Sequence, residues 1–394
     1  MIINLSHIQK NKYKRNKTSA HNFIVLLKQI DYLAGPVLLK VAEIILNIRL
    51  KKPSINNNDC TEQNINRILI IRPGGIGDAV LLIPSLKIFK KNMPDVKVDV
   101  LCEPRNREIF NGLPWIDEVL SYKNIKDMLY ITKNHYDIVF DTEQSHFLSA
   151  VFVSQFKNSL KVGFATNGRE KIYDVAIKYH QNQYEMDSFF RLFKSGVKRW
   201  PVRMPWDPPF FNVIPEQKIK VDRLIQGIKK PIACIFPGAS IKQRHWPVKR
   251  WINVAEHLWD KGFHVIVLGS KDECDIAFEI EYHACCPVTN LCCRLSLSET
   301  TVLFKKASVL ISTDSGILHL GVLSELPTIS LFGPGIAEKW GPKGKKHIVL
   351  NKKLSCSPCT RFGETPPCPI GEKCMATIKV KDVVNAVSKL NRNS

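Results

Sequence analysis

Three short turns, each placed after an apolar run, carry the residue types in this chain that could do chemistry. The first turn, residues 72–78, reads RPGGIGD, and its glycines let the backbone turn tightly and let a substrate approach it closely. Its last residue has two interpretations that the local sequence leaves open: a general base, or the N-cap of the following helix. The negative charge of this carboxylate would disfavour the binding of a phosphate at the same turn. The candidate residues of this turn are Gly74, Gly75, Gly77 and Asp78.

The second turn, residues 237–240 (PGAS), is followed by a cluster of cations. Its small residues expose backbone N–H groups, and Ser240 adds a hydroxyl donor. Lys242 and Arg244 could neutralise a diphosphate. The alternative is a solvated basic loop without a ligand.

The third turn, residues 313–316, opens a helix. A helix N-terminus presents unsatisfied N–H groups and the positive end of the helix dipole, which suits a phosphate. His319, one turn into the helix, could donate to the same oxygens, and the alternative for it is a core histidine. Gly333, after the next apolar run, adds a further backbone-exposing loop. The phosphate-binding candidates of this turn are Asp314, Ser315, Gly316 and His319.

Two sheets must position these turns. Short apolar runs of parallel-strand type alternate with helical stretches in both halves of the chain. Ligands of open α/β sheets bind at the carboxyl ends of the strands, where the three turns fall. The sequence therefore predicts an α/β fold of two doubly wound, Rossmann-like domains joined by a Pro-rich connection at residues 200–215. The expected strands are 67–71, 96–101, 137–140, 159–163, 232–236, 264–268, 308–312 and 328–332, and the expected helices are 79–91, 249–261 and 316–323.

Composition narrows the class of protein. The 394 residues suffice for two domains, and 44% hydrophobic with 24% charged residues is near the globular average. The net charge of +21 indicates an anionic partner. Zinc-finger spacing, RNP-like aromatic motifs and basic heptads are absent from the sequence, so nucleic acid is not the expected partner. Twelve cysteines without an apolar leader segment indicate free thiols in a reducing cytoplasm.

The first 66 residues form a basic extension, with ten Lys and Arg against four Asp and Glu. Residues 23–50 are apolar but interrupted by charges, so they lack the roughly 20 apolar residues in a row that a spanning helix needs. We expect two short amphipathic helices hinged at Gly35-Pro36, then a polar linker at residues 51–66. The helices either lie on an anionic membrane surface or pack on the protein itself.

Together the three motifs resemble glycosyltransferase family 9, the ADP-heptose:lipopolysaccharide heptosyltransferase family. RPGGIGD at residues 72–78 with Pro84 downstream, PGAS leading to RHWP at residues 237–247, and DSGILH at residues 314–319 occur in the order and spacing of that family. The resemblance covers roughly residues 67–350. It implies a GT-B fold, in which two Rossmann-like domains face a cleft. It also implies an inverting transfer of a heptose from an ADP-sugar.

The resemblance also implies roles for individual residues. Asp78 would be the general base, and Arg244 would contact the donor phosphates or sugar. Arg169, in VGFATNGR at residues 162–169, is similar to a segment on the acceptor side, which the glycines of the first turn would share. The donor-binding residues would be Ser240, Lys242, Asp314, Ser315, Gly316, His319 and Gly333.

The expected partners are an ADP-sugar donor and an anionic lipopolysaccharide-core or other surface-glycan acceptor at the inner face of the cytoplasmic membrane. No cofactor is expected, because the cations and the helix start supply a positive field and the chain has no Asp-x-Asp pair suited to Mg²⁺. A nucleotide-sugar-binding protein without transferase activity is the alternative, and Asp78 argues against it. An NAD-dependent oxidoreductase is opposed by Val80 at the third glycine position of its fingerprint.

Cysteines concentrate in the tail, with the spacing C-x2-C-x8-C-x5-C. Four thiols at such spacing could hold Zn²⁺ tetrahedrally, and the alternatives are free cysteines, a disulfide or redox chemistry. We expect the pairs Cys285-Cys286 and Cys292-Cys293 to pack rather than to bind a metal. The zinc candidates are Cys356, Cys359, Cys368 and Cys374.

These features divide the chain into four regions. A final helix at residues 381–390 is expected to cross back and brace the first domain. The predicted regions are the N-terminal extension and linker (1–66), the acceptor-side domain (67–215), the nucleotide-sugar-binding domain (216–350) and the Cys-rich tail with the final helix (351–394).

Overall fold

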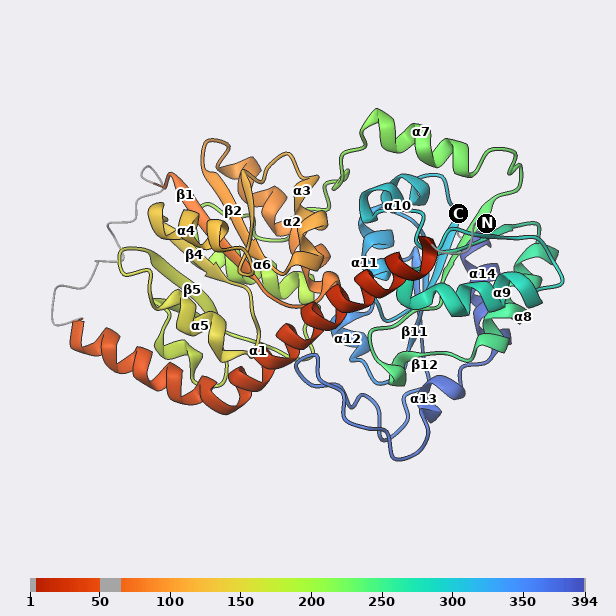
Figure 1. The fold of residues 1–394 in the computed structure, drawn as a ribbon. Helices are drawn as coiled ribbons and strands as arrows, with labels where there is room; N and C mark the ends of the chain where they lie inside the picture. The colour runs from red at the N-terminus through yellow and green to blue at the C-terminus, as the bar shows by residue number, and fades with distance from the viewer. Residues whose placement is uncertain (1–4, 50–64, 393–394) are drawn as a thin grey trace.

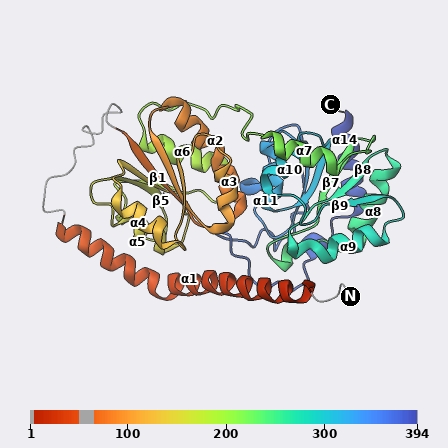
Figure 2. The ribbon, with the colours of Figure 1, turned by 45° about the horizontal axis from the view of Figure 1, so that its top comes forward.

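The computed structural model describes residues 5–49 and 65–392, which form two parallel six-stranded sheets with helices around them (Figures 1 and 2). The first sheet lies at one end of the molecule and the second at the other, and helix α1 (Leu5–Arg49) extends along one side (Figure 2). The predicted linker at residues 51–66 lies almost wholly outside the described residues.

The first sheet is built around β1 (Arg67–Arg72), an apolar run buried along its length. Side chains alternate along a strand, so Ile68 enters one apolar core and Leu69 the core on the opposite face. The strand order is β3-β2-β1-β4-β5-β6 with parallel pairing, and it reverses direction beside β1. The other strands are β2 (Lys97–Cys102), β3 (Glu118–Ser121), β4 (Ile138–Asp141), β5 (Leu160–Ala165) and β6 (Val175–Lys178).

Helices cover both faces of this sheet. Helices α2 (Ile76–Asn92) and α6 (Glu185–Gly196) pack together on one face. Helix α5 (Phe147–Val153) lies on the other face, where α1 packs against it. The remaining helices of this half are α3 (Arg107–Asn111) and α4 (Ile125–Lys133).

The second sheet repeats the plan with strand order β12-β11-β10-β7-β8-β9. Its central strands, β7 (Ile232–Phe236) and β10 (Val309–Thr313), are buried along their whole length. The other strands are β8 (His264–Val267), β9 (Val288–Asn290), β11 (Thr328–Phe332) and β12 (His347–Asn351). The helices are α7 (Pro215–Leu224), α8 (Val248–Asp260), α9 (Cys274–His283), α10 (Leu297–Phe304), α11 (Gly316–Leu323), α12 (Ala337–Trp340), α13 (Lys373–Ala376) and α14 (Val380–Arg392).

The prediction of two doubly wound α/β sheets is confirmed. Strands β7 and β11 and helix α11 have the predicted bounds, and the other predicted elements are shifted at their ends by a few residues at most. The edge strands β3, β6, β9 and β12 escape prediction because they are short and only partly buried, and so they lack a continuous apolar run. The four region boundaries stay predictions.

The predicted pair of hinged N-terminal helices is wrong, because α1 is one helix with Pro36 inside it. The face that includes Gly35 and Leu39 is buried against the first domain. A Cβ atom on Gly35 would lie 2.9 Å from the Phe147 side chain, so glycine allows α1 to approach α5 closely. The free energy gained by this packing exceeds the free energy lost with the backbone hydrogen bond that proline removes.

The prediction that the last helix braces the first domain is also wrong. Helix α14 packs on α8, β11 and β12 of the second half. Its buried face includes Val383, Val387 and Leu390, which lie on one side of a helix and belong to the apolar core of the second sheet. Among the described helices, none is long and apolar enough to cross a membrane.

Candidate active site

The first turn begins where β1 ends, and α2 starts at Ile76. Gly74 has φ 104°, in the left-handed region that favours glycine. The N-cap of α2 is Gly75, so the interpretation of Asp78 as the N-cap is wrong. Asp78 lies instead in the first turn of α2, partly buried, where its carboxylate complements the helix dipole.

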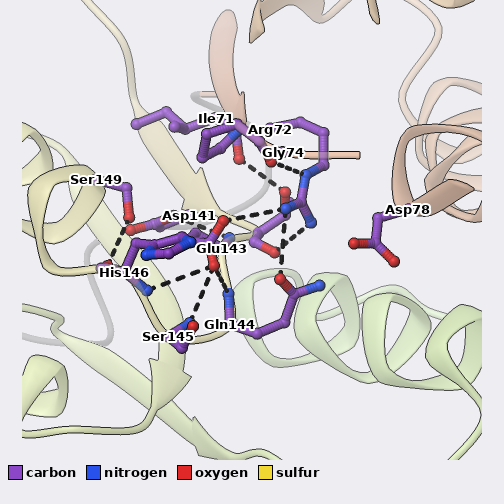
Figure 3. Close-up of polar contacts among 12 residues, drawn as sticks. Ile71, Arg72, Gly74, Asp78, Asp141, Glu143, Gln144, Ser145, His146 and Ser149 are labelled. Carbon is purple, nitrogen blue, oxygen red and sulfur yellow. Dashed lines mark hydrogen bonds and ion pairs between the residues drawn. The ribbon is translucent and has the colours of Figure 1, made fainter. Parts of the chain in front are cut away.

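A buried polar network lies beside Asp78 (Figure 3). The Arg72 guanidinium donates to the Thr142 carbonyl at 2.8 Å and forms an ion pair with Glu143 at 3.2 Å. Burial alone would raise the pKa of Glu143, but the neighbouring cations, above all Arg72, hold that pKa below its ordinary value. Glu143 is therefore ionised, and Figure 3 draws no polar contact between this network and Asp78.

The sequence patterns do not single out Glu143 or its neighbour Gln144. Both come after β4, so they lie at the same carboxyl edge as the first turn. The segment DTEQ at residues 141–144 could have identified these two residues, because it places polar side chains directly after a buried strand.

Arg169 is fully buried rather than presented to an acceptor. Its guanidinium forms an ion pair with Asp141 at 2.8 Å and donates to the Glu143 carbonyl at 2.8 Å. The Tyr173 hydroxyl donates to the same Asp141 carboxylate at 2.7 Å. In this arrangement Arg169 supports the loop after β4.

The start of α11 carries the second part of the site. Ser315 is its N-cap, and the Ser315 side chain makes no capping hydrogen bond to the first N–H groups of the helix. Arg244, from the 3₁₀ turn η4 (Lys242–Arg244), reaches this helix start, where its Nη1 atom is 3.3 Å from the Asp314 carboxylate. Asp314 is buried, and an ionised carboxylate repels a phosphate. Its position therefore suits it to orient Arg244 rather than to bind an anion itself.

His319 lies buried one turn into α11. Burial lowers its pKa to about 4, so the imidazole is neutral near pH 7. Within the described residues its Nδ1 atom has no hydrogen-bond partner. A Cβ atom on Gly77 would lie 3.1 Å from the His319 Cδ2 atom, so the ring packs against the first turn. The burial fits a core histidine, and the unpaired nitrogen leaves it able to bind a ligand.

The helix starts of α2 and α11 meet across the two halves. A Cβ atom on Gly316 would lie 2.7 Å from the Ile76 side chain and 3.1 Å from the Gly77 nitrogen. Only glycine permits so close an approach. The contact brings Asp78 and the N–H groups of α11 into one region.

Helix α12 of the second half reaches into the first half, between the two sheets (Figure 1). The Trp340 indole donates to the Asp78 carboxylate at 3.4 Å. Lys339 forms a buried ion pair with Glu185 at 2.6 Å, and its ammonium lies 4.0 Å from the centre of the Tyr179 ring. Burial, with a contribution from Asp78, raises the pKa of Glu185, while Lys339 opposes that rise. Nothing in the local sequence around Lys339 predicts these contacts.

Other predicted site residues lie farther from this contact. Ser240 and Lys242 are exposed on the loop after β7. Gly333 is buried against α13, because a Cβ atom there would lie 2.6 Å from the Met375 sulfur. The Gly333 carbonyl also accepts a hydrogen bond from the Ser357 hydroxyl. Gly333 therefore joins the tail to the second sheet.

The tail cysteines do not converge on one point. Within residues 5–49 and 65–392, a single group of three or more ligand atoms lies within 4.8 Å of one another, and it includes no tail cysteine. The four thiols, which the sequence offers only as candidate zinc ligands beside other interpretations, thus do not come together as a tetrahedral site in this arrangement. The group consists instead of Cys274, Cys292 and Cys293. Cys292 also packs against the apolar core of the second sheet, so the expectation that the last two pack rather than bind a metal stays a prediction.

Comparison with known proteins identifies the family. The model of glycosyltransferase family 9 (heptosyltransferase) matches residues 129–368. Lipopolysaccharide heptosyltransferase 1 of Pseudomonas aeruginosa is 22% identical over 327 residues, which is 75% of this chain and 86% of that protein.

Solved structures show the same architecture. Escherichia coli ADP-heptose lps heptosyltransferase II superposes with a TM-score of 0.66 at 18% identity, covering 83% of this chain and 100% of that one. E. coli heptosyltransferase WaaC with ADP-2-deoxy-2-fluoro heptose gives a TM-score of 0.61 at 18% identity, covering 82% and 99%. The fold is therefore GT-B, with two Rossmann-like domains.

The family match covers more than half of the chain, and it includes the second and third turns. The first turn lies upstream of the matched residues, on the sheet that the solved structures share. The chain therefore belongs to glycosyltransferase family 9, the heptosyltransferase family, and is a glycosyltransferase.

Proposed function

We propose that this enzyme transfers a heptose or a related sugar, with inversion, from an ADP-sugar to the lipopolysaccharide core or to another surface glycan. The observation that carries the proposal is the close contact between the first turn, which carries Asp78, and the start of α11, which Arg244 reaches through its ion pair with Asp314. The names of the relatives support the sugar, because they are lipopolysaccharide and lipooligosaccharide heptosyltransferases.

In the proposed reaction Asp78 takes the proton from an acceptor hydroxyl. That oxygen forms a bond to the anomeric carbon while the bond from this carbon to the diphosphate oxygen breaks. Attack opposite the leaving group inverts the anomeric carbon. Negative charge grows on the departing ADP, where Arg244 and the N–H groups at the start of α11 stabilise it.

In this proposal the two domains bind different substrates. The acceptor approaches the first turn at Gly74, Gly75 and Gly77, and the donor is held by the second domain. The exposed Ser240 and Lys242 are placed to meet the donor from the loop beside Arg244. Because Arg244 and the helix start already provide positive charge, we propose that the transfer needs no cofactor.

Nucleotide binding tests the donor side directly. ADP is expected to raise the melting temperature of the wild-type protein more than UDP or GDP does, with or without a divalent metal. Arg244→Ala should weaken ADP binding by about 10- to 100-fold, because it removes a charged hydrogen-bond donor. Thermal shift and calorimetry measure both effects.

The matched control for that variant is Lys249→Ala, which removes an exposed cation from the neighbouring helix α8 and should leave ADP affinity unchanged. Stabilisation by UDP or GDP instead of ADP would keep the glycosyltransferase and reject the ADP-sugar donor. Equal ADP affinity in Arg244→Ala and the wild type would reject the role of Arg244.

We further propose that α1 attaches the enzyme to the anionic inner face of the cytoplasmic membrane. One side of α1 is buried against the first domain, and the opposite side carries an exposed apolar stripe at helical spacing. The net charge of +21 suits an anionic surface. The stripe consists of Leu26, Ile30, Leu33, Val37, Val41, Ile44 and Ile48.

A vesicle assay checks this attachment. The Leu33→Asp, Val37→Asp double variant should bind vesicles of phosphatidylcholine and phosphatidylserine about tenfold more weakly or worse, because it puts two charges where apolar side chains would be buried. Ile125→Asp is the control, since Ile125 is equally exposed but lies on α4. Cosedimentation measures binding, and equal binding by both variants would contradict the proposal.

A further inference from the structure

Three cysteine thiols meet at the carboxyl edge of the second sheet. Cys274 begins α9, while Cys292 and Cys293 come after β9. The Cys274 sulfur lies 3.4 Å from the Cys292 sulfur and 3.2 Å from the Cys293 sulfur. All three sulfurs lie within 4.8 Å of one another.

Three features of the backbone around this three-thiol cluster allow the sulfur atoms to lie close together. Cys293 has φ 59°, a left-handed conformation that a residue with a side chain adopts at a cost in free energy. The Cys292 thiol also donates to the Ser270 carbonyl at 2.9 Å. A Cβ atom on Gly269 would lie 2.9 Å from the Cys292 sulfur, so glycine makes room for the thiol. The loop that leads into α9 and the loop after β9 thus contact each other through the thiols.

We propose that Cys274, Cys292 and Cys293 form a binding site for a thiophilic divalent cation such as Zn²⁺. Thiolates are soft ligands that prefer such ions to Mg²⁺ or Ca²⁺. Three thiolates also fill three of the four positions around a tetrahedral zinc ion. Cys293 is exposed, so water from solvent can take the fourth position.

The geometry needs only a small adjustment to bind the ion. Two thiolates at 2.3 Å from one tetrahedral zinc ion are about 3.8 Å apart, so the present separations must widen by about half an ångström. Binding releases the three thiol protons to solvent as three S–Zn bonds form. Burial and the neighbouring Cys274 raise the pKa of Cys292, and the charge of a bound dication would reverse that effect.

The site has a structural consequence for the second domain. A bound ion would tie the start of α9 to the loop after β9. Glu273, directly before Cys274, packs against Gly238 of the second turn and accepts hydrogen bonds from Ser270. The ion would therefore stabilise the backbone next to the proposed donor loop without taking part in transfer. Its binding does not depend on the proposed function.

Zinc content tests the proposal. The full-length chain is purified with a thiol reductant, stripped with a chelator and reloaded with Zn²⁺ alone. We expect Cys274→Ser, Cys292→Ser to hold one zinc ion fewer per chain than the wild type, counted by native mass spectrometry. The control is Cys285→Ser, Cys286→Ser, which removes two thiols of the same domain outside the cluster and should keep the wild-type count.

Cobalt provides a second readout. The wild type loaded with Co²⁺ should show a sulfur-to-cobalt charge-transfer band, which the cluster variant loses in part or whole and the control keeps. Equal zinc content in the cluster variant and the control overturns the proposal. If the double variant fails to fold, the single change Cys293→Ser at an exposed side chain decides in the same way.

Discussion

Asp78→Asn should lower kcat by about 10²- to 10⁴-fold, the contribution typical of a general base, while ADP affinity stays nearly unchanged. The amide cannot take the proton of the acceptor hydroxyl. It keeps the shape of aspartate, and its oxygen can still accept the hydrogen bond from the Trp340 indole. Initial rates at saturating donor and acceptor, with calorimetry for ADP, separate the two effects.

Asp95→Asn is the matched control for this loss. It makes the same chemical change at an exposed position outside the proposed site, so its turnover should equal that of the wild type. Unchanged turnover in Asp78→Asn would reject the assigned base. A parallel loss of ADP affinity would show that Asp78 supports the donor site rather than proton transfer.

Lys339→Met should lower the free energy of unfolding by about 3–5 kcal/mol, because it leaves the Glu185 carboxylate buried without its cation. The pair joins α12 of the second half to α6 of the first, so the loss also loosens the contact between the two halves. Denaturant unfolding followed by tryptophan fluorescence measures the change.

Two further variants and the pH dependence test whether the unpaired Glu185 carboxylate causes this loss of stability. Lys345→Met, at an exposed position, should be nearly neutral. Glu185→Gln combined with Lys339→Met should recover part of the loss, because the buried charge is gone. Without Lys339 the folded-state pKa of Glu185 rises further above its wild-type value, so the loss should grow as pH rises above the wild-type folded-state pKa, which itself lies above the ordinary value of a glutamate. A loss that is the same at all pH values would contradict this account.

The strands and turns of the active site could be predicted because their signals are local. An apolar run such as residues 232–236 specifies a buried strand by its own composition, and parallel strands bring the loops after them to one edge of the sheet. The three turns and Asp78 were therefore identified from sequence. The ion pair of Asp314 with Arg244 could not be predicted, because the two residues lie 70 positions apart in the chain and only the fold brings them together.

Local sequence patterns are sufficient to predict the two sheets, the glycines at the helix starts and the residue types available for proton transfer and charge stabilisation. The packing of the folded chain was needed to show that α1 continues through Pro36, that Arg169 is buried, and that α12 carries Lys339 to Glu185. The fold also brings together the thiols of Cys274, Cys292 and Cys293, whereas the tail cysteines form no such group among the described residues. The difference arises because apolar periodicity is a relation between residues that are close together in the chain. Ion pairs, thiol clusters and close approaches depend on distances between segments that only the packed fold establishes.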